Sequence, residues 1–173
     1  MKNLVRILII ICSLPYFCTK EKNNGFISLP SNLKESGLGM NLSCDEFKKI
    51  FHDKMKIVAV INSDCSVCHS EIWEWERLIK KHHEFSEVPI VFILFGSEFN
   101  LPERLYRSTV FNNFSFFLDK EKQFYRLNCL SADKSLSAFL LDSNWRIVSP
   151  GNPIYSEAIL NNYLSVVANT NSN

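Results

Sequence analysis

The sequence predicts an α/β fold of three layers (α/β/α), in which helices cover both faces of a central mixed sheet. Two short runs rich in β-branched and aromatic residues, KIVAVI at 56–61 and PIVFILFG at 89–96, have the composition of strands buried on both faces. Helix-patterned segments separate these runs, as they do where crossover helices join parallel strands. Two further strand-like runs and a helix close the chain, and they make the expected sheet mixed.

Hydrophobic spacing predicts the remaining elements in order. A first helix is expected near residues 45–54, because Phe47, Ile50 and Phe51 recur at helical intervals. The expected strands are 56–61, 89–96, 114–119 and two in a hairpin over 135–150 that turns at residues 142–144. The other expected helices are 65–85, 101–113, 120–128 and 155–168.

The composition is that of one globular domain without a nucleic-acid surface. Of the 173 residues, 46% are hydrophobic and 13% aromatic, which is enough apolar material for a packed core. The formal net charge is +1, and no basic stripe follows one face of the chain. Because a protein needs such a surface to bind phosphate backbones, nucleic acid is not an expected partner.

The N-terminus has the pattern of an export signal over residues 1–18. Lys2 and Arg6 accompany an apolar run from Ile7 to Leu14 that is too short to span a bilayer comfortably. A buried strand or a retained membrane anchor is the alternative. Cys18 follows the run where a bacterial lipoprotein signal would be cut and acylated, so it is a candidate lipidation site, with ordinary cleavage as the alternative.

Export determines the expected organisation and location of the rest of the chain. Residues 19–41 are polar, contain Gly, Pro, Ser and Asn, and are interpreted as a linker, so that residues 42–173 form the domain. The expected location is the periplasm, either as a soluble protein or as a membrane-anchored lipoprotein that faces the periplasm or the cell surface. Cysteines in such a compartment can persist as disulfides.

The most informative motif is Cys65-x-x-Cys68, which follows a predicted buried strand and opens a predicted helix. In the first turn of a helix, unpaired backbone N–H groups and the helix dipole favour a thiolate, so Cys65 is the candidate nucleophile. Cys68 lies one turn later on the apolar face and is the candidate resolving thiol. Asp64 is expected to cap the helix, and its charge disfavours the thiolate, so only moderate activation of Cys65 is expected.

Other uses of the motif are less well supported. A covalent haem would use His69 as one axial ligand and usually a Met or a second His as the other, but every Met precedes the motif. The sequence contains no second Cys-x-x-Cys and no His-x-x-His, so neither a metal ion nor a cofactor is expected. His69 is interpreted as a surface residue, with a tuning role as the alternative. Cys44 and Cys129 are either buried thiols or halves of a structural bridge.

Two stretches carry a family resemblance. IVAVINSDCSVCHSEIWEWERL and SAFLLDSNWRIVSPGNP resemble the active-site strand and helix and the late hairpin of exported TlpA-like thiol-disulfide oxidoreductases, which have a thioredoxin-like fold. The resemblance covers residues 45–168 and is particularly close to thioredoxin-like lipoproteins of Bacteroidetes-type bacteria. Members usually carry an aromatic residue where this chain has Asp64, and a cis-proline where it has Leu136. A trans residue there is expected to bring the late strand to the dithiol differently.

The resulting hypothesis is an exported enzyme that exchanges disulfides with envelope proteins, with Cys65 attacking and Cys68 resolving. Its expected partners are disulfide-bearing or dithiol envelope proteins, together with a membrane tether through Cys18. The residues expected to flank the site are Asp64, Ser66, Val67, His69 and Leu136. The alternative is a tethered binding or accessory lipoprotein without catalysis, in which a Cys65–Cys68 disulfide is structural.

Overall fold

The computed structural model describes residues 25–30, 32–35, 41–96, 114–130 and 132–171. The expected export signal, Cys18 and the expected helix 101–113 lie outside the described residues. The strands are β1 (Asn32–Glu35), β2 (Asn41–Ser43), β3 (Lys56–Asn62), β4 (Ile90–Phe95), β5 (Phe114–Leu118), β6 (Ala138–Leu141) and β7 (Ile147–Pro150). The helices are α1 (Cys44–Ile50), α2 (Ser66–Lys81), α4 (Gln123–Leu127) and α5 (Glu157–Asn171), with short 3₁₀ turns η1 (His83–Phe85) and η3 (Lys134–Leu136).

The described strands form one mixed sheet in the order β2-β1-β5-β4-β3-β6-β7. β3, β4 and β5 are parallel, with Val58 beside Val91 and Val91 beside Ser115. β6 runs antiparallel to β3, and β7 follows it as the second strand of the predicted hairpin. The carboxyl ends of β3 and β4 therefore lie at the same edge of the sheet, where ligand sites of open α/β sheets usually form.

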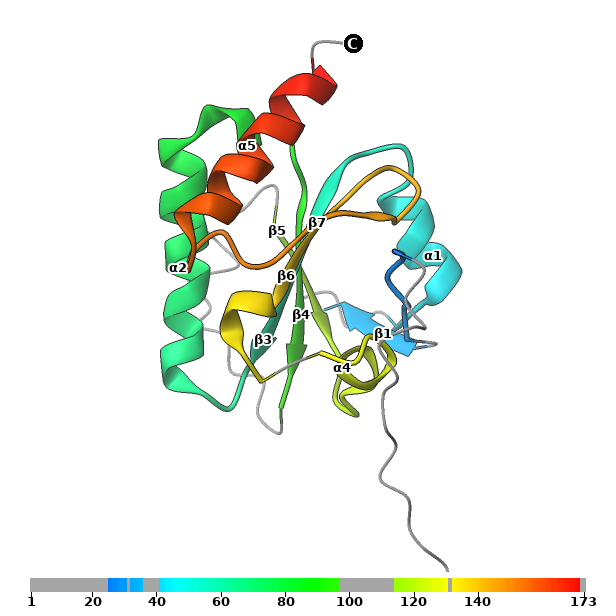
Figure 1. The fold of residues 1–173 in the computed structure, drawn as a ribbon. Helices are drawn as coiled ribbons and strands as arrows, with labels where there is room; N and C mark the ends of the chain where they lie inside the picture. The colour runs from blue at the N-terminus through cyan, green and yellow to red at the C-terminus, as the bar shows by residue number, and fades with distance from the viewer. Residues whose placement is uncertain (1–24, 31, 36–40, 97–113, 131, 172–173) are drawn as a thin grey trace, which may run out of the picture.

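Helices cover both faces of this sheet (Figure 1). Alternate residues of β3 point to opposite faces, as in any strand. Ile57 belongs to the core cluster that contains Trp75 of α2 and Tyr163 of α5, whereas Val58 belongs to the cluster that contains Phe47 of α1. The predicted three-layer α/β/α fold with a mixed sheet is confirmed.

Part of the segment expected to be linker lies in the sheet instead. β1 pairs antiparallel with β5, and Leu33 is only 1% exposed. Phe26 forms a β-bridge with Arg146, and Ile27 is buried in the same cluster as Leu33. The polar composition of residues 19–41 conceals these apolar side chains, which are too widely spaced to form a strand pattern. The described fold therefore begins before residue 42.

The expected helix 65–85 is interrupted near its end. His82 has an extended backbone (φ −123°, ψ 94°), so α2 stops at Lys81 and a 3₁₀ turn follows. The apolar spacing of the sequence does not reveal this break, because Phe85, which follows it, is also buried in the core. Within the described part of the chain, no helix is both long enough and apolar enough to cross a membrane.

Candidate active site

Cys65 occupies the N-cap position of α2 and carries a thiol. Its backbone is extended (φ −104°, ψ 111°), and its side chain makes no capping hydrogen bond to the helix. The side chain is half-buried and lines a cavity at the carboxyl ends of β3 and β4. The sulfur therefore lies beside the cavity and close to the positive end of a long helix, which favours a thiolate.

The loop before Cys65 is built differently from expectation, because Asp64 does not occupy the N-cap. The Asp64 N–H donates to Oδ1 of Asn62 (3.0 Å), and this turn places the helix start one residue later. Ser63 anchors the loop on β4, since its N–H (2.8 Å) and its hydroxyl (3.1 Å) both donate to the Phe95 carbonyl. Gly96 follows Phe95 with φ +150°, and a Cβ there would lie 2.7 Å from Oδ1 of Asp64.

We expect Gly96→Ala to displace the loop that presents Cys65. The added methyl group meets Asp64 and Ser63 in a backbone region that L-residues rarely adopt. The free energy of unfolding should fall by about 1–3 kcal/mol, and alkylation of Cys65 should change in rate. Gly25→Ala is the matched control, because Gly25 also has positive φ (+76°) but its nearest neighbour atoms are 4.0 Å away. Equal effects of the two variants on Cys65 would contradict this role of Gly96.

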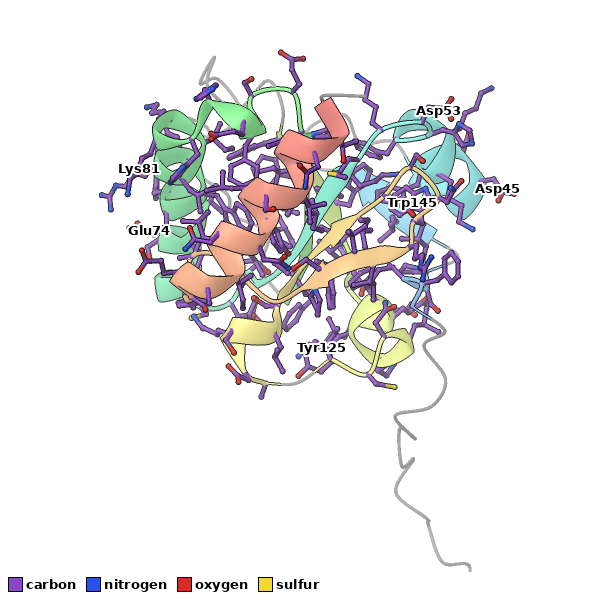
Figure 2. All side chains as sticks on the ribbon, turned by 45° about the horizontal axis from the view of Figure 1, so that its top comes forward. Asp45, Asp53, Glu74, Lys81, Tyr125 and Trp145 are labelled. Carbon is purple, nitrogen blue, oxygen red and sulfur yellow. The ribbon has the colours of Figure 1, made fainter. Side chains whose placement is uncertain are left out.

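The cavity beside Cys65 has a volume of about 420 Å³. Its floor comes from the end of β3, at Val60 and Ile61, and one wall carries the rings of Phe95 and Tyr125. The two ring centroids are 5.6 Å apart. Figure 2 shows Tyr125 between α4 and the η3 turn. A hollow of this size with apolar walls and a few polar groups is typical of sites for small ligands or single side chains.

Asp119 fixes the position of α4 in this wall. Its carboxylate accepts hydrogen bonds from the N–H groups of Gln123 (2.9 Å) and Phe124 (2.7 Å), and its own N–H donates to the Leu94 carbonyl (2.7 Å). Phe124 is fully buried and anchors the helix in the core. α4 therefore presents Tyr125 to the cavity from a fixed base.

The structure also places a partly buried ion pair at the cavity. Oε1 of Glu71 in α2 lies 2.7 Å from Nζ of Lys134 in η3, and both residues line the cavity. The Glu71 side chain is 6% exposed and that of Lys134 is 43% exposed, so the lysine reaches in from the surface to an enclosed carboxylate. Neither residue is among those that the sequence predicts for the site. The available signal was that Glu71 follows Cys68 by three residues and therefore lies on the same side of α2.

The η3 turn stands where the resembled family has its cis-proline. The described residues contain no cis peptide bond, and Leu136 is 46% exposed. Three backbone N–H groups form hydrogen bonds within the turn. Ser135 N–H donates to the Asp133 carboxylate (2.9 Å), Leu136 N–H to the Asp133 carbonyl (3.0 Å) and Ser137 N–H to the Lys134 carbonyl (3.2 Å).

The other predicted site residues are placed only in part. Ser66, Val67, Cys68 and His69 form the first turn of α2, and their side chains lie outside the described part. Cys44 begins α1, again without a described side chain. Cys129 is exposed and disulfide-bonded, which agrees with the bridge alternative for that residue. The described structure therefore places Cys65 at the site and leaves its approach to Cys68 as a prediction.

Comparison with known proteins supports the fold. No protein-family model matches the chain, and no curated protein matches it. Solved structures do match. Yeast Sco1 is 13% identical, with 87% of this chain and 97% of that chain covered and a TM-score of 0.57. A putative thiol:disulfide interchange protein DsbE from Chlorobium tepidum is 14% identical (83% and 96% covered; TM-score 0.54), and MTB dsbF is 13% identical (81% and 99% covered; TM-score 0.51). The chain has a thioredoxin-like fold.

Proposed function

We propose that this protein is an exported thiol-disulfide oxidoreductase of the TlpA-like type. The observation that carries the proposal is the Cys65 thiol, which is half-buried at the N-cap of α2 and opens on the cavity beside β3 and β4. A structural cysteine is usually enclosed, whereas a reactive one needs access together with a positive environment. One solved structure of the same fold is named a putative thiol:disulfide interchange protein, and another, MTB dsbF, was solved in mixed oxidized and reduced forms, which is consistent with this chemistry.

The proposed reaction transfers two electrons from the dithiol to a substrate disulfide. The Cys65 thiolate attacks one substrate sulfur, the substrate S–S bond breaks, and the departing sulfur takes up a proton. Cys68 then loses its proton and attacks the Cys65 sulfur of the mixed disulfide. The second substrate sulfur leaves as a thiolate, takes up a proton, and leaves a Cys65–Cys68 disulfide. Both substrate sulfurs end as thiols, and the protein is oxidised to its Cys65–Cys68 disulfide.

The proposed setting is the bacterial envelope. Residues 1–18 would direct export, and acylation of Cys18 would tether the domain as a lipoprotein of the Bacteroidetes type. Proteins of this compartment carry disulfides that persist, so they supply both substrates and electron donors for such an exchange. The proposed partners are therefore envelope proteins with a disulfide or a dithiol.

Exchange with oxidised glutathione tests the chemistry. Reduced protein should become oxidised at Cys65 and Cys68 with loss of two hydrogens in its intact mass, and Cys65→Ala should abolish this oxidation. The accessory-lipoprotein alternative predicts a different result: the pair would be isolated as a disulfide that glutathione neither forms nor opens on the timescale of exchange. The same result would overturn the proposed activity.

A further inference from the structure

We propose that Lys134 is a positioning residue for the exchange reaction: it ties the η3 turn to α2 through Glu71 and balances the charge of Glu71 in the cavity of Cys65. This inference rests on the proposed function and names a residue that neither the motif nor the family resemblance indicates. In the resembled family a cis-proline occupies this place. This chain has Leu136 there, so other contacts must hold the turn that faces the thiol.

The ion pair of Glu71 and Lys134 connects two parts of the chain that lie on either side of the cavity. Glu71 and Lys134 are 63 residues apart, and their contact joins the helix that begins at Cys65 to the turn on the opposite side of the cavity. A carboxylate as enclosed as that of Glu71 needs a partner, because an uncompensated buried charge is strongly unfavourable. Lys134 supplies the cation, so neither side of the cavity is free to move without breaking the pair.

Asn152 holds the η3 turn from its other side as well. The Asn152 N–H donates to the Ser135 carbonyl (2.6 Å), and Nδ2 of Asn152 donates to the Ser137 hydroxyl (3.1 Å). Asn152 is itself only 1% exposed. The turn is thus fixed between Asn152 on one side and α2 on the other, and Lys134 lines the cavity together with its neighbours Asp133 and Ser137.

The ion pair also sets the balance of charge in the cavity. The charged residues described along the cavity are Glu71, Lys122, Asp133 and Lys134, alongside the Cys65 thiol. Removing the lysine alone would leave the Glu71 carboxylate uncompensated, and a nearby negative charge disfavours a thiolate. Removing the carboxylate alone would leave the Lys134 ammonium, which favours a thiolate. The two single changes should therefore act on Cys65 in opposite directions.

The test measures alkylation of Cys65 by neutral iodoacetamide from pH 5 to 10, in the reduced full-length protein, by mass spectrometry. The variants are Lys134→Met, Glu71→Gln and the double variant, with Lys134→Arg as the conservative change. The matched control pair is Lys80→Met and Glu76→Gln. Those residues form an ion pair of similar length on the same helix (Nζ to Oε1, 2.6 Å) with a similarly enclosed carboxylate, but they do not line the cavity.

We expect Lys134→Met to raise the pH midpoint of Cys65 alkylation by roughly half a unit to one unit, and Glu71→Gln to lower it by a similar amount. The double variant and Lys134→Arg should return close to the parent value. At pH 7, Lys134→Met should slow exchange with oxidised glutathione roughly threefold to tenfold. The control pair should leave both quantities unchanged, even where it lowers stability.

Shifts of the same sign for Lys134→Met and Glu71→Gln, or equal shifts in the control pair, would overturn the role of Lys134. If Lys134→Met does not fold, the opposite sign is still tested by Glu71→Gln and by the double variant, which leaves no unpaired charge. Alkylation requires no substrate disulfide. If the variants shift the alkylation midpoint with the expected signs but the parent protein does not exchange with glutathione, the proposed function is contradicted. The charge coupling between the ion pair and Cys65 is then still established.

Discussion

Replacing Cys68 by serine is expected to leave the protein covalently linked to its substrate, whereas replacing Cys65 should leave no linked species. Cys65 lies at the N-cap of α2 and lines the cavity, so under the proposed function it is the sulfur that attacks the substrate disulfide. Without a resolving thiol the mixed disulfide on Cys65 has no internal path to release. Non-reducing gels of envelope extracts or of a model disulfide substrate, followed by mass spectrometry, would detect the adduct.

The double variant Cys65→Ser/Cys68→Ser is the control for this experiment. Cys129 is also exposed and takes part in a disulfide, so exchange at that bond could produce adducts unrelated to the site. The double variant retains Cys129 and should show no trapped partner beyond this background. Equal trapping by Cys65→Ser and Cys68→Ser would contradict the assignment of attacking and resolving thiols.

Lys56→Met is expected to stabilise the protein at neutral pH. Lys56 begins β3 at the end of the sheet away from the cavity and is 0% exposed. Its Nζ lies 4.2 Å from the ring centroid of Trp145 and donates to the Ser143 carbonyl (3.2 Å). Figure 2 shows Trp145 on the β6–β7 hairpin beside α1, and its ring centroid lies 5.3 Å from that of Phe47. Methionine has a similar shape and no charge to desolvate, so it should fill the same space.

The pKa of Lys56 gives the size and pH dependence of this effect. Burial lowers its pKa from 10.5 to about 8, against the opposing charges of Asp142 and Asp53. Between these two values the unfolded chain holds the proton and the folded protein does not, so the free energy of unfolding rises with pH. A shift of this size corresponds to about 3 kcal/mol. Below pH 8 that penalty is fully present, and the methionine variant should avoid most of it.

Urea denaturation from pH 6.5 to 9.5 measures this prediction. The parent should gain stability as pH rises through 8, and Lys56→Met should show a flatter profile that starts about 2–3 kcal/mol higher. Burial also raises the pKa of Tyr163, but this contribution is shared by both proteins and cancels in their difference. Lys54→Met, which changes an exposed lysine nearby, is the control. A stability loss in Lys56→Met would show that its contacts outweigh its desolvation.

The parts of the fold that the sequence predicts correctly are those with a dense local pattern. The run KIVAVI is buried throughout in β3, and the Asp142 turn forms because the Asp142 carboxylate accepts from the N–H groups of Asn144 (2.8 Å) and Arg146 (2.9 Å). β1 escaped prediction because Leu33 is an isolated apolar residue in a polar stretch. Its strand exists through pairing with β5, which no local pattern reveals.

The candidate site divides in the same way. Cys65 could be placed at the start of a helix because a strand, a motif and an apolar helix face follow one another in sequence. The pair of Glu71 and Lys134 could not be predicted, since its members are brought together only by the fold. Asp64 has the residue type of an N-cap, but its N–H group bonds to Asn62 and the helix starts after it. Such competition between local hydrogen bonds depends on the exact backbone path.

The most direct test of the redox role is the reduction potential of the Cys65–Cys68 pair. The mature protein would be equilibrated in a series of glutathione or dithiothreitol buffers and alkylated. Mass spectrometry of the intact protein and of its peptides would then identify the oxidised cysteines. We predict a reversible two-electron transition confined to these two cysteines, at roughly −120 to −270 mV, where thiol-exchange proteins lie. A pair that stays oxidised below roughly −300 mV would instead be a structural bridge and would contradict the proposed oxidoreductase.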